Sequence, residues 1–112
     1  MPRYVPARGD FVWLDFHSQV GHEQKGRRPA LVVSPRDYNA KASLALCCPI
    51  TSKIKGYPFE TQVDPPDSVR GVILCDQVRS LDWRARRATL IGRASRQCLD
   101  DVMAKIESLL DR

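Results

Sequence analysis

Residues 23–33 of the chain read EQKGRRPALVV. The apolar run Ala30–Val33 is typical of a buried strand, and Glu23–Pro29 places one carboxylate, a flexible glycine and two arginines directly before it. An arginine at the lip of a strand is held firmly, and its guanidinium group matches the oxygens of a phosphate. A carboxylate in the adjoining loop can approach the same phosphate and move protons. This stretch therefore predicts a site for phosphate chemistry.

The segments around this stretch predict a protein of short strands. Gly9–Phe16 is rich in aromatic and β-branched side chains and predicts the first strand. The second is expected at Pro29–Ser34, with the proline at its first position or on an edge because it lacks an N–H group. The polar segment between them, His17–Gly26, predicts a long mobile loop of the kind that carries function. Ser34–Asn39 is expected to form a turn or one short helical turn, and Arg79–Arg87 is expected to lie outside the core. Further strands are expected at Ser43–Ile50, at Tyr57–Val63, within Val69–Val78 and at Ala88–Gly92.

The clearest expected element is a helix at the end of the chain. Its apolar residues recur at helical spacing, Ser95 is a suitable N-cap, and Asp100 and Asp101 lie near the positive end of the helix dipole. With six short strands, residues 1–112 are expected to form one domain, mainly β with a C-terminal helix, as a strongly curved antiparallel sheet or small barrel. The apolar face of the helix consists of Leu99, Val102, Met103, Ile106, Leu109 and Leu110.

The composition favours a soluble globular protein with a polyanionic partner. The formal net charge is +5, and 13 of the 18 basic residues are arginine. Arginine binds phosphate groups well, although a basic surface can also serve solubility alone. No apolar stretch is long enough to cross a bilayer, and the N-terminus lacks the pattern of a signal peptide. The cytoplasm is therefore the expected location.

The four cysteines, Cys47, Cys48, Cys75 and Cys98, lack the spacing of a metal site. There is no Cys-x-x-Cys pair, and no histidine is spaced to complete a zinc site. Cys47 and Cys48 lie in an apolar segment, where cysteine behaves as a small buried hydrophobe. All four are therefore expected to be structural, and no bound metal is expected.

The chemistry of RNA cleavage suggests roles for three residues. The 2′-hydroxyl must lose a proton, the leaving 5′-oxygen must gain one, and charge on the phosphate oxygens must be stabilised. Arg28 fits the stabilising role, Glu23 can act as the base, and the Thr51 hydroxyl can donate to a phosphate oxygen. Arg27 should point to the opposite face of the strand because side chains alternate. The alternative is a surface glutamate–arginine ion pair of little energetic effect.

Histidines and tryptophans offer further candidates. His22 is a possible substrate contact, whereas His17, in the same loop, is more simply a solvated side chain. Trp83, within DWRARR, could stack on bases beside phosphates, or could pack inward beneath a solvated arginine face. Trp13 lies in an expected strand and is more typical of a core residue. The sequence contains no nucleophile elbow, P-loop or dinucleotide-binding fingerprint.

Five stretches between Arg3 and Ala88 resemble the MazF/PemK family of toxins from type II toxin–antitoxin pairs, the MazF branch most of all. They read RYVPARGDFVWLDF, GHEQKGRRPALVVSP, YNAKASLALCCPIT, KGYPFE and CDQVRSLDWRARRA. The resemblance implies a PemK/CcdB-type fold, a small SH3-like barrel with a helix, and a homodimer. It also implies a metal-independent endoribonuclease without a cofactor. Such an enzyme cuts single-stranded RNA within a short sequence, leaves a 2′,3′-cyclic phosphate and a 5′-hydroxyl, and inhibits translation.

The resemblance also implies a site and two partners. The catalytic residues of the family fall on Glu23, Arg28 and Thr51, in agreement with the roles above. RNA is expected in a groove at the dimer interface, and a cognate antitoxin is expected to cover that groove with an acidic flexible tail, whose charge complements this basic chain. The candidate RNA-binding residues are His22, Gln24, Lys25, Arg27, Ser52, Lys53, Lys55, Gln77, Arg79, Trp83, Arg84 and Arg86.

Two features of the sequence depart from the family pattern. Arg27 stands where MazF carries histidine, so proton transfer is lost there and extra phosphate affinity is expected. Residues 52–56, SKIKG, are more basic than expected.

Two other functional classes are alternatives to the endoribonuclease. One is a CcdB-like poison that binds DNA gyrase without catalysis, and the other is a nucleic-acid-binding barrel that does not cleave. The EQ-x-G-x-RP stretch and Thr51 favour the endoribonuclease, since a gyrase poison has no use for them.

Overall fold

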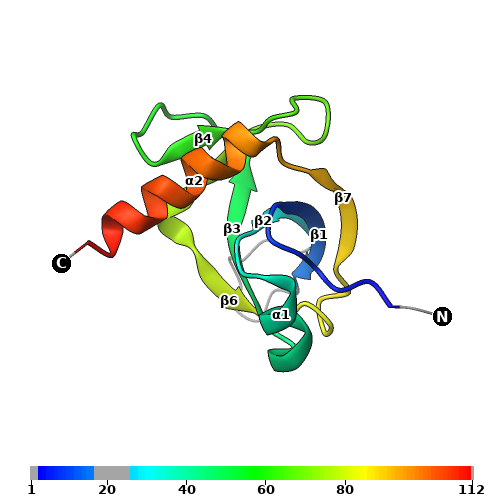
Figure 1. Cartoon of the computed structure of the whole chain (residues 1–112). Coiled ribbons are helices and arrows are strands. Elements are labelled where there is room, and N and C mark those ends of the chain that lie inside the picture. Colours follow the sequence, from blue (N-terminus) through cyan, green and yellow to red (C-terminus); the bar gives the residue numbers. More distant parts are fainter. Residues whose placement is uncertain (1–2, 17–25, 112) are drawn as a thin grey trace, which may run out of the picture.

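The computed structural model describes residues 3–16 and 26–111. In this part of the chain, antiparallel strands follow one another in the order β4-β5-β3-β2-β1-β7, and β6 pairs with β3. The predicted class, mainly antiparallel β with a C-terminal helix, is confirmed (Figure 1). Neither α-helix in this part is long and apolar enough to span a membrane. The strands are β1 (Asp10–Phe16), β2 (Gly26–Val32), β3 (Ala45–Thr51), β4 (Glu60–Gln62), β5 (Val72–Leu74), β6 (Arg79–Leu81) and β7 (Thr89–Arg93), and the helices are α1 (Arg36–Ala42), the single turn η1 (Cys75–Gln77) and α2 (Arg96–Leu109).

The three central strands bury both of their faces. On β1, Phe11 packs into one core cluster, whereas Val12 and Leu14 pack into another. The first cluster includes Val102 of α2, and the second includes Trp83, which follows β6. Because successive side chains point to opposite faces, both kinds of position must be apolar. This explains why the central strands read as apolar runs and not as clean alternations.

Strand β3 has partners along both of its edges. On one edge β2 pairs with its middle residues. On the other edge β6 pairs with its beginning, and β5 pairs with its last two residues, Ile50 and Thr51. The turn η1 connects β5 to β6, so the chain passes through it from the last residues of β3 to the first residues of β3. The strand predicted within Val69–Val78 is therefore shorter, because this step interrupts it.

The expectation that Arg79–Arg87 lies outside the core is wrong. This segment contains β6, and Leu81 and Trp83 within it are only 5% and 6% exposed. The indole N–H of Trp83 donates to the carbonyl oxygen of Asn39 over 2.9 Å. Leu81 and Trp83 are two residues apart and point inward, while the polar residues beside them reach the solvent. The density of arginines concealed this short alternating pattern.

Several predicted boundaries shift for local reasons. The segment expected to form a turn or one short helical turn begins the seven-residue helix α1, and Ser43 ends that helix in a left-handed conformation with φ of 57°. The third strand consequently begins at Ala45 and not at Ser43. Pro29 is the fourth residue of β2, not the first. It pairs with Trp13 of β1, just beyond the point where β3 stops pairing with β2. The remaining shifts are β4, shorter than Tyr57–Val63, and β7, one residue later than Ala88–Gly92.

Helix α2 begins at the predicted cap. The Ser95 hydroxyl accepts a hydrogen bond from the N–H group of Cys98 over 3.1 Å. Four of the predicted apolar residues, from Leu99 to Ile106, pack against the core. The prediction is wrong for Leu109 and Leu110, which are 49% and 71% exposed. The last turn extends away from the sheet, as Figure 1 shows, so these two side chains find no surface to cover.

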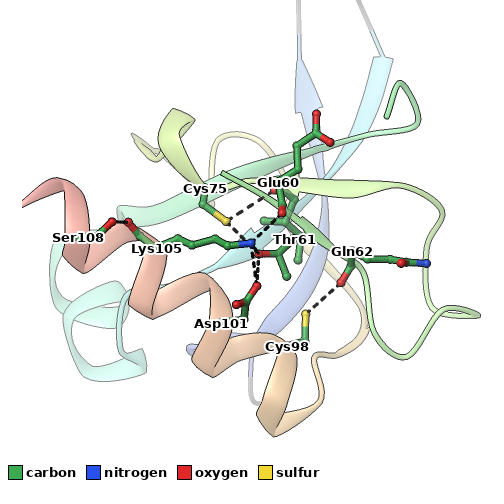
Figure 2. A network of polar contacts seen from close by, with 9 residues as sticks. Glu60, Thr61, Gln62, Cys75, Cys98, Asp101, Lys105 and Ser108 are labelled. Atoms are coloured by element: carbon green, nitrogen blue, oxygen red, sulfur yellow. Dashed lines mark hydrogen bonds and ion pairs between the residues drawn. The ribbon is translucent and has the colours of Figure 1, made fainter. Parts of the chain in front are cut away.

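A polar cluster attaches α2 to β4 (Figure 2). The Lys105 ammonium group donates to the Glu60 carbonyl oxygen over 2.8 Å and to the Thr61 hydroxyl over 3.0 Å. The Asp101 carboxylate accepts from the Thr61 hydroxyl over 2.6 Å and lies 3.0 Å from Lys105. The bond from Thr61, and then that from Lys105, hold the pKa of Asp101 below its usual range. These contacts fix β4 against the helix.

Candidate functional site

Side-chain alternation along β2 and β3 assigns Arg28 and Thr51 to one face. The pairing of β2 with β3 ends at Ala30 and Pro49, which lie opposite each other. If the same register is continued by two residues, Arg28 stands opposite Thr51. Because side chains alternate, both residues share the face of Ala30 and Pro49. The predicted guanidinium and hydroxyl groups thus emerge on the same side, at the end where the two strands separate.

Arg28 stands in a paired strand, and its charge has no partner among the described residues. It is half-buried and pairs with Leu14 of β1. Among residues 3–16 and 26–111, no group forms a hydrogen bond or ion pair with its guanidinium group. A guanidinium group that no described residue engages, carried on the same face as a hydroxyl, is suited to an anion with several oxygens, such as a phosphate.

Thr51 presents its hydroxyl in a defined way. The hydroxyl oxygen accepts a hydrogen bond from the N–H group of Lys53 over 3.1 Å, so its own proton remains available for a ligand. The backbone of Thr51 is held by close approach to Gly71, where a Cβ atom would lie 2.1 Å from the Thr51 carbonyl oxygen. Gly71 also has a φ of 123°, so only glycine fits beside this part of the site.

A pocket of about 210 Å³ adjoins Thr51. It brings together four predicted residues from two distant parts of the chain: Thr51, Lys53 and Lys55 from the third strand and its loop, and Gln77 from η1. The mixture of ammonium groups, a hydroxyl and an amide suits a ligand with both phosphates and hydrogen-bonding bases. The pocket is also lined by residues that the sequence analysis did not select, namely Tyr57, Phe59, Glu60, Leu74 and Asp76.

Arg27 differs sharply from its neighbour. Side-chain alternation, as predicted, sends it to the opposite face of β2 from Arg28. There its guanidinium group pairs with the carboxylate of Asp15 and donates to the hydroxyl of Thr89 over 2.7 Å and to the carbonyl oxygen of Arg87 over 2.9 Å. Arg27 therefore joins β1, β2 and β7. This structural role was not predicted and competes with the phosphate contact that was.

The two tryptophans differ in burial, which decides between the alternatives for Trp83 and contradicts the expectation for Trp13. Trp83 is buried, and the Arg84 guanidinium lies 4.8 Å from the centre of its ring system. This burial supports the inward-packed alternative and leaves little ring surface for a base. Trp13, expected in the core, is the middle residue of β1 and is 37% exposed. It shares a face of the strand with Phe11, but unlike Phe11 it is not part of the first core cluster.

The other arginines after β5 are not equivalent. Arg86 lies over the ring of Phe16 at 4.7 Å and donates to the Asp15 carbonyl oxygen over 3.1 Å, so the sheet holds its guanidinium group. Arg79 is exposed on β6 and pairs through its backbone with Cys47 of β3. Arg79 is thus the more accessible of these two candidates for an RNA phosphate.

Five residues discussed from the sequence lie outside the described part of the chain. They include Glu23, so its distance from Arg28 stays a prediction. Ser52 is described, and it is exposed directly after Thr51. The five residues are His17, His22, Glu23, Gln24 and Lys25.

The cysteines are free and buried, as expected of structural residues. Burial raises the pKa of Cys47 and of Cys48 to about 12, and burial also raises the pKa of Cys75 and of Cys98. A thiol that stays protonated is a poor nucleophile and a poor metal ligand. In the described part of the chain, no three His, Cys, Asp or Glu residues are grouped so that they could hold a metal ion.

Comparison with known proteins agrees with the motifs. The family of PemK-like, MazF-like toxins of type II toxin–antitoxin systems matches residues 7–110, and the chain belongs to this family. The endoribonuclease toxin MazF of Escherichia coli K12 is 47% identical over 108 residues, which are 96% of each chain. The endoribonuclease toxin ChpB of the same strain is 34% identical over 110 residues, 93% of each chain. The crystal structure of MazE–MazF (Form-II) from Deinococcus radiodurans contains a chain that is 52% identical, with a TM-score of 0.90 over 96% of this chain and 97% of that one.

Proposed function

We propose that this protein is an endoribonuclease toxin that cleaves single-stranded RNA within a short sequence. Relatives that match along nearly their whole length are named endoribonucleases. The observation that carries the proposal is the basic pocket that brings Thr51 together with Lys53, Lys55 and Gln77. The register of β2 and β3, continued by two residues, assigns Arg28 to the same face as Thr51. Inhibition of translation follows if the substrate is messenger RNA.

Arg28 and Thr51 bind the phosphate at which cleavage occurs. The guanidinium group donates to its non-bridging oxygens, where negative charge grows as the 2′-oxygen attacks phosphorus. The Thr51 hydroxyl donates to one of the same oxygens. Glu23 takes the proton of the 2′-hydroxyl, the bond from phosphorus to the 5′-oxygen breaks, and that oxygen is protonated from water. The products are a 2′,3′-cyclic phosphate and a 5′-hydroxyl. The guanidinium supplies the positive charge, so the reaction needs no metal ion.

The pocket beside Thr51 binds the nucleotides that flank the cut. Lys53 and Lys55 supply positive charge for phosphates, and the Gln77 amide can both donate to and accept from a base edge. Exposed Arg79 extends this basic surface along β6. Base contacts in such a pocket select the sequence, while the phosphate contacts set affinity.

Two partners complete the proposal. A second copy of the chain forms a homodimer whose interface groove holds the RNA. A cognate antitoxin occupies that groove with an acidic flexible tail, since the toxin carries a net charge of +5. The Deinococcus relative is described as a MazE–MazF structure, which supports an antitoxin of that kind. The proposed location is the cytoplasm, where RNA and antitoxin are both present.

Analysis of the product ends tests the function directly. Purified protein is incubated with a long defined RNA and excess EDTA, and the cut sites are mapped by primer extension. We expect cuts at one short motif, 5′-hydroxyl ends, and no cleavage of an RNA with a single 2′-deoxynucleotide before the cut. RNA that stays intact would overturn the proposal. A parallel supercoiling assay would then reveal a gyrase poison, and a gel shift a barrel that binds without cutting.

A further inference from the structure

Glu60, the last residue of the stretch KGYPFE, connects the pocket to the helix and is not among the predicted site residues. The residue begins β4 and lines the pocket next to Lys53 and Lys55. Its carboxylate accepts hydrogen bonds from the N–H group of Gly56 over 2.9 Å and from that of Lys55 over 3.2 Å. One side chain thus receives two successive backbone donors of the basic loop.

The loop before β4 depends on such side-chain acceptors. Residues 53–56 belong to no strand or helix. At the start of the loop Lys53 donates to the Thr51 hydroxyl, and at its end Lys55 and Gly56 donate to Glu60. Carboxylates are strong acceptors, and an exposed loop without them samples many conformations. Glu60 therefore holds the backbone of Lys55, from which that lysine side chain extends, and closes the end of the loop that begins at Lys53.

Glu60 is itself held from behind. Its carbonyl oxygen accepts from Lys105 over 2.8 Å, and the next residue, Thr61, bonds to Asp101 of α2. In Figure 2 the carboxyl group of Glu60 points away from Lys105, while its main chain faces the helix. The α2 contacts therefore fix the backbone and leave the carboxylate directed at the loop.

We propose that Glu60 is a positioning residue that sets the shape of the RNA pocket by holding the loop at residues 53–56. This inference rests on the proposed function for its RNA readout. A carboxylate in a pocket for a polyanion would repel phosphates if it faced them unbound. Two backbone N–H groups already engage this one, so it orders the cationic loop without contacting the RNA.

Hydrogen exchange in the free protein tests the loop contact without any RNA. In Glu60→Ala, the amides of Lys55 and Gly56 lose their acceptor, and we expect them to exchange about tenfold faster. Glu60→Gln keeps a side-chain oxygen and should retain most of the protection. Unchanged exchange in Glu60→Ala would overturn the proposal, whether or not the protein cleaves RNA. The melting temperature of each variant identifies one that has failed to fold.

Cleavage kinetics test the consequence for RNA. For Glu60→Ala we expect KM to rise about tenfold and the preference for the best motif over a single-base mismatch to fall, with kcat changed less. Glu60→Gln should restore both properties. Glu107→Gln, which removes an exposed charge from α2, serves as the matched control and should behave as wild type.

The outcomes separate the competing explanations. If Glu60→Gln is as impaired as Glu60→Ala, the charge matters and not the acceptor, and the proposal is wrong. If cleavage falls while amide exchange stays unchanged, Glu60 contacts RNA directly, which also contradicts it. If exchange changes as expected but wild-type protein leaves RNA intact, the loop contact stands and the proposed function fails.

Discussion

At the scale of single residues, the pair Arg27 and Arg28 shows how adjacent identical side chains acquire different tasks. Alternation along β2 sends them to opposite faces, and that much follows from sequence. The partners do not, because Asp15 and Thr89 of other strands meet Arg27 only after folding. Arg28 finds no such partner in the described residues, and this difference makes it the better candidate for phosphate binding.

Substitution of Thr51 should separate its hydroxyl from its shape. Thr51→Ser keeps a donor for the phosphate and an acceptor for Lys53, whereas Thr51→Val keeps the volume but has neither. We expect cleavage to fall about 10- to 100-fold in the valine variant and only a few-fold in the serine variant. Single-turnover rates on one RNA give the measurement. Equal rates for the valine variant and wild type would remove Thr51 from the mechanism.

At the scale of elements, α2 does more than cover the sheet. Four of the six residues of its apolar face, from Leu99 to Ile106, were predictable from helical spacing alone, and so was its Ser95 cap. The polar cluster that attaches α2 to β4 was not predictable, because Thr61 and Asp101 are 40 residues apart in sequence. Because Asp101 belongs to this polar cluster, part of the stability of the fold depends on pH.

Asp101→Asn should change the acid sensitivity of the fold. The pKa of Asp101 is lower in the folded chain than its ordinary value of 3.8. Its contacts therefore stabilise the fold above that value, and this contribution is lost as the pH falls through the lowered pKa. We expect the variant to be less stable by about 1 kcal/mol at pH 7, after allowance for solvent screening, with the difference vanishing in acid.

Urea unfolding at several pH values measures this effect, with Asp100→Asn as the control. Asp100 is the adjacent residue, and its ion pair with Arg96 is largely exposed. The Asp100→Asn substitution should therefore change the free energy of unfolding little at any pH. If the free energy of unfolding depends on pH in the same way in both variants, the polar cluster does not stabilise the fold through the Asp101 carboxylate.

Elements also show where sequence patterns stop being informative. The buried strands and α2 could be predicted because hydrophobic periodicity is a local signal. The strand β6 was missed because three residues carry little periodicity and arginines surround them. The pairing of β3 with both β5 and β6 has no local signal at all. The contacts of Arg28 and Thr51 with RNA, and the position of Glu23, remain predictions.

At the scale of the whole molecule, the net charge of +5 predicts salt-sensitive binding of single-stranded nucleic acid. Each phosphate contact contributes about −0.7 to the slope of log K against log salt concentration. Arg79→Ala, which removes an exposed arginine from β6, should make this slope shallower by about that amount. The probe is a 2′-deoxy version of the cleaved motif, measured by fluorescence anisotropy. Arg36→Ala on α1 is the control, and an equal slope change there would mean that only total charge matters.

The measurement that tests the central claim most directly is the single-turnover cleavage rate of Arg28→Ala beside Arg28→Lys and Arg36→Ala. The claim is that a guanidinium group fixed on β2 stabilises the charge that develops on the scissile phosphate. We expect the alanine variant to cleave about 10²- to 10³-fold more slowly, the lysine variant to recover part of that loss, and Arg36→Ala to match wild type, all with unchanged melting temperatures. Cleavage by Arg28→Ala at the wild-type rate would contradict the account.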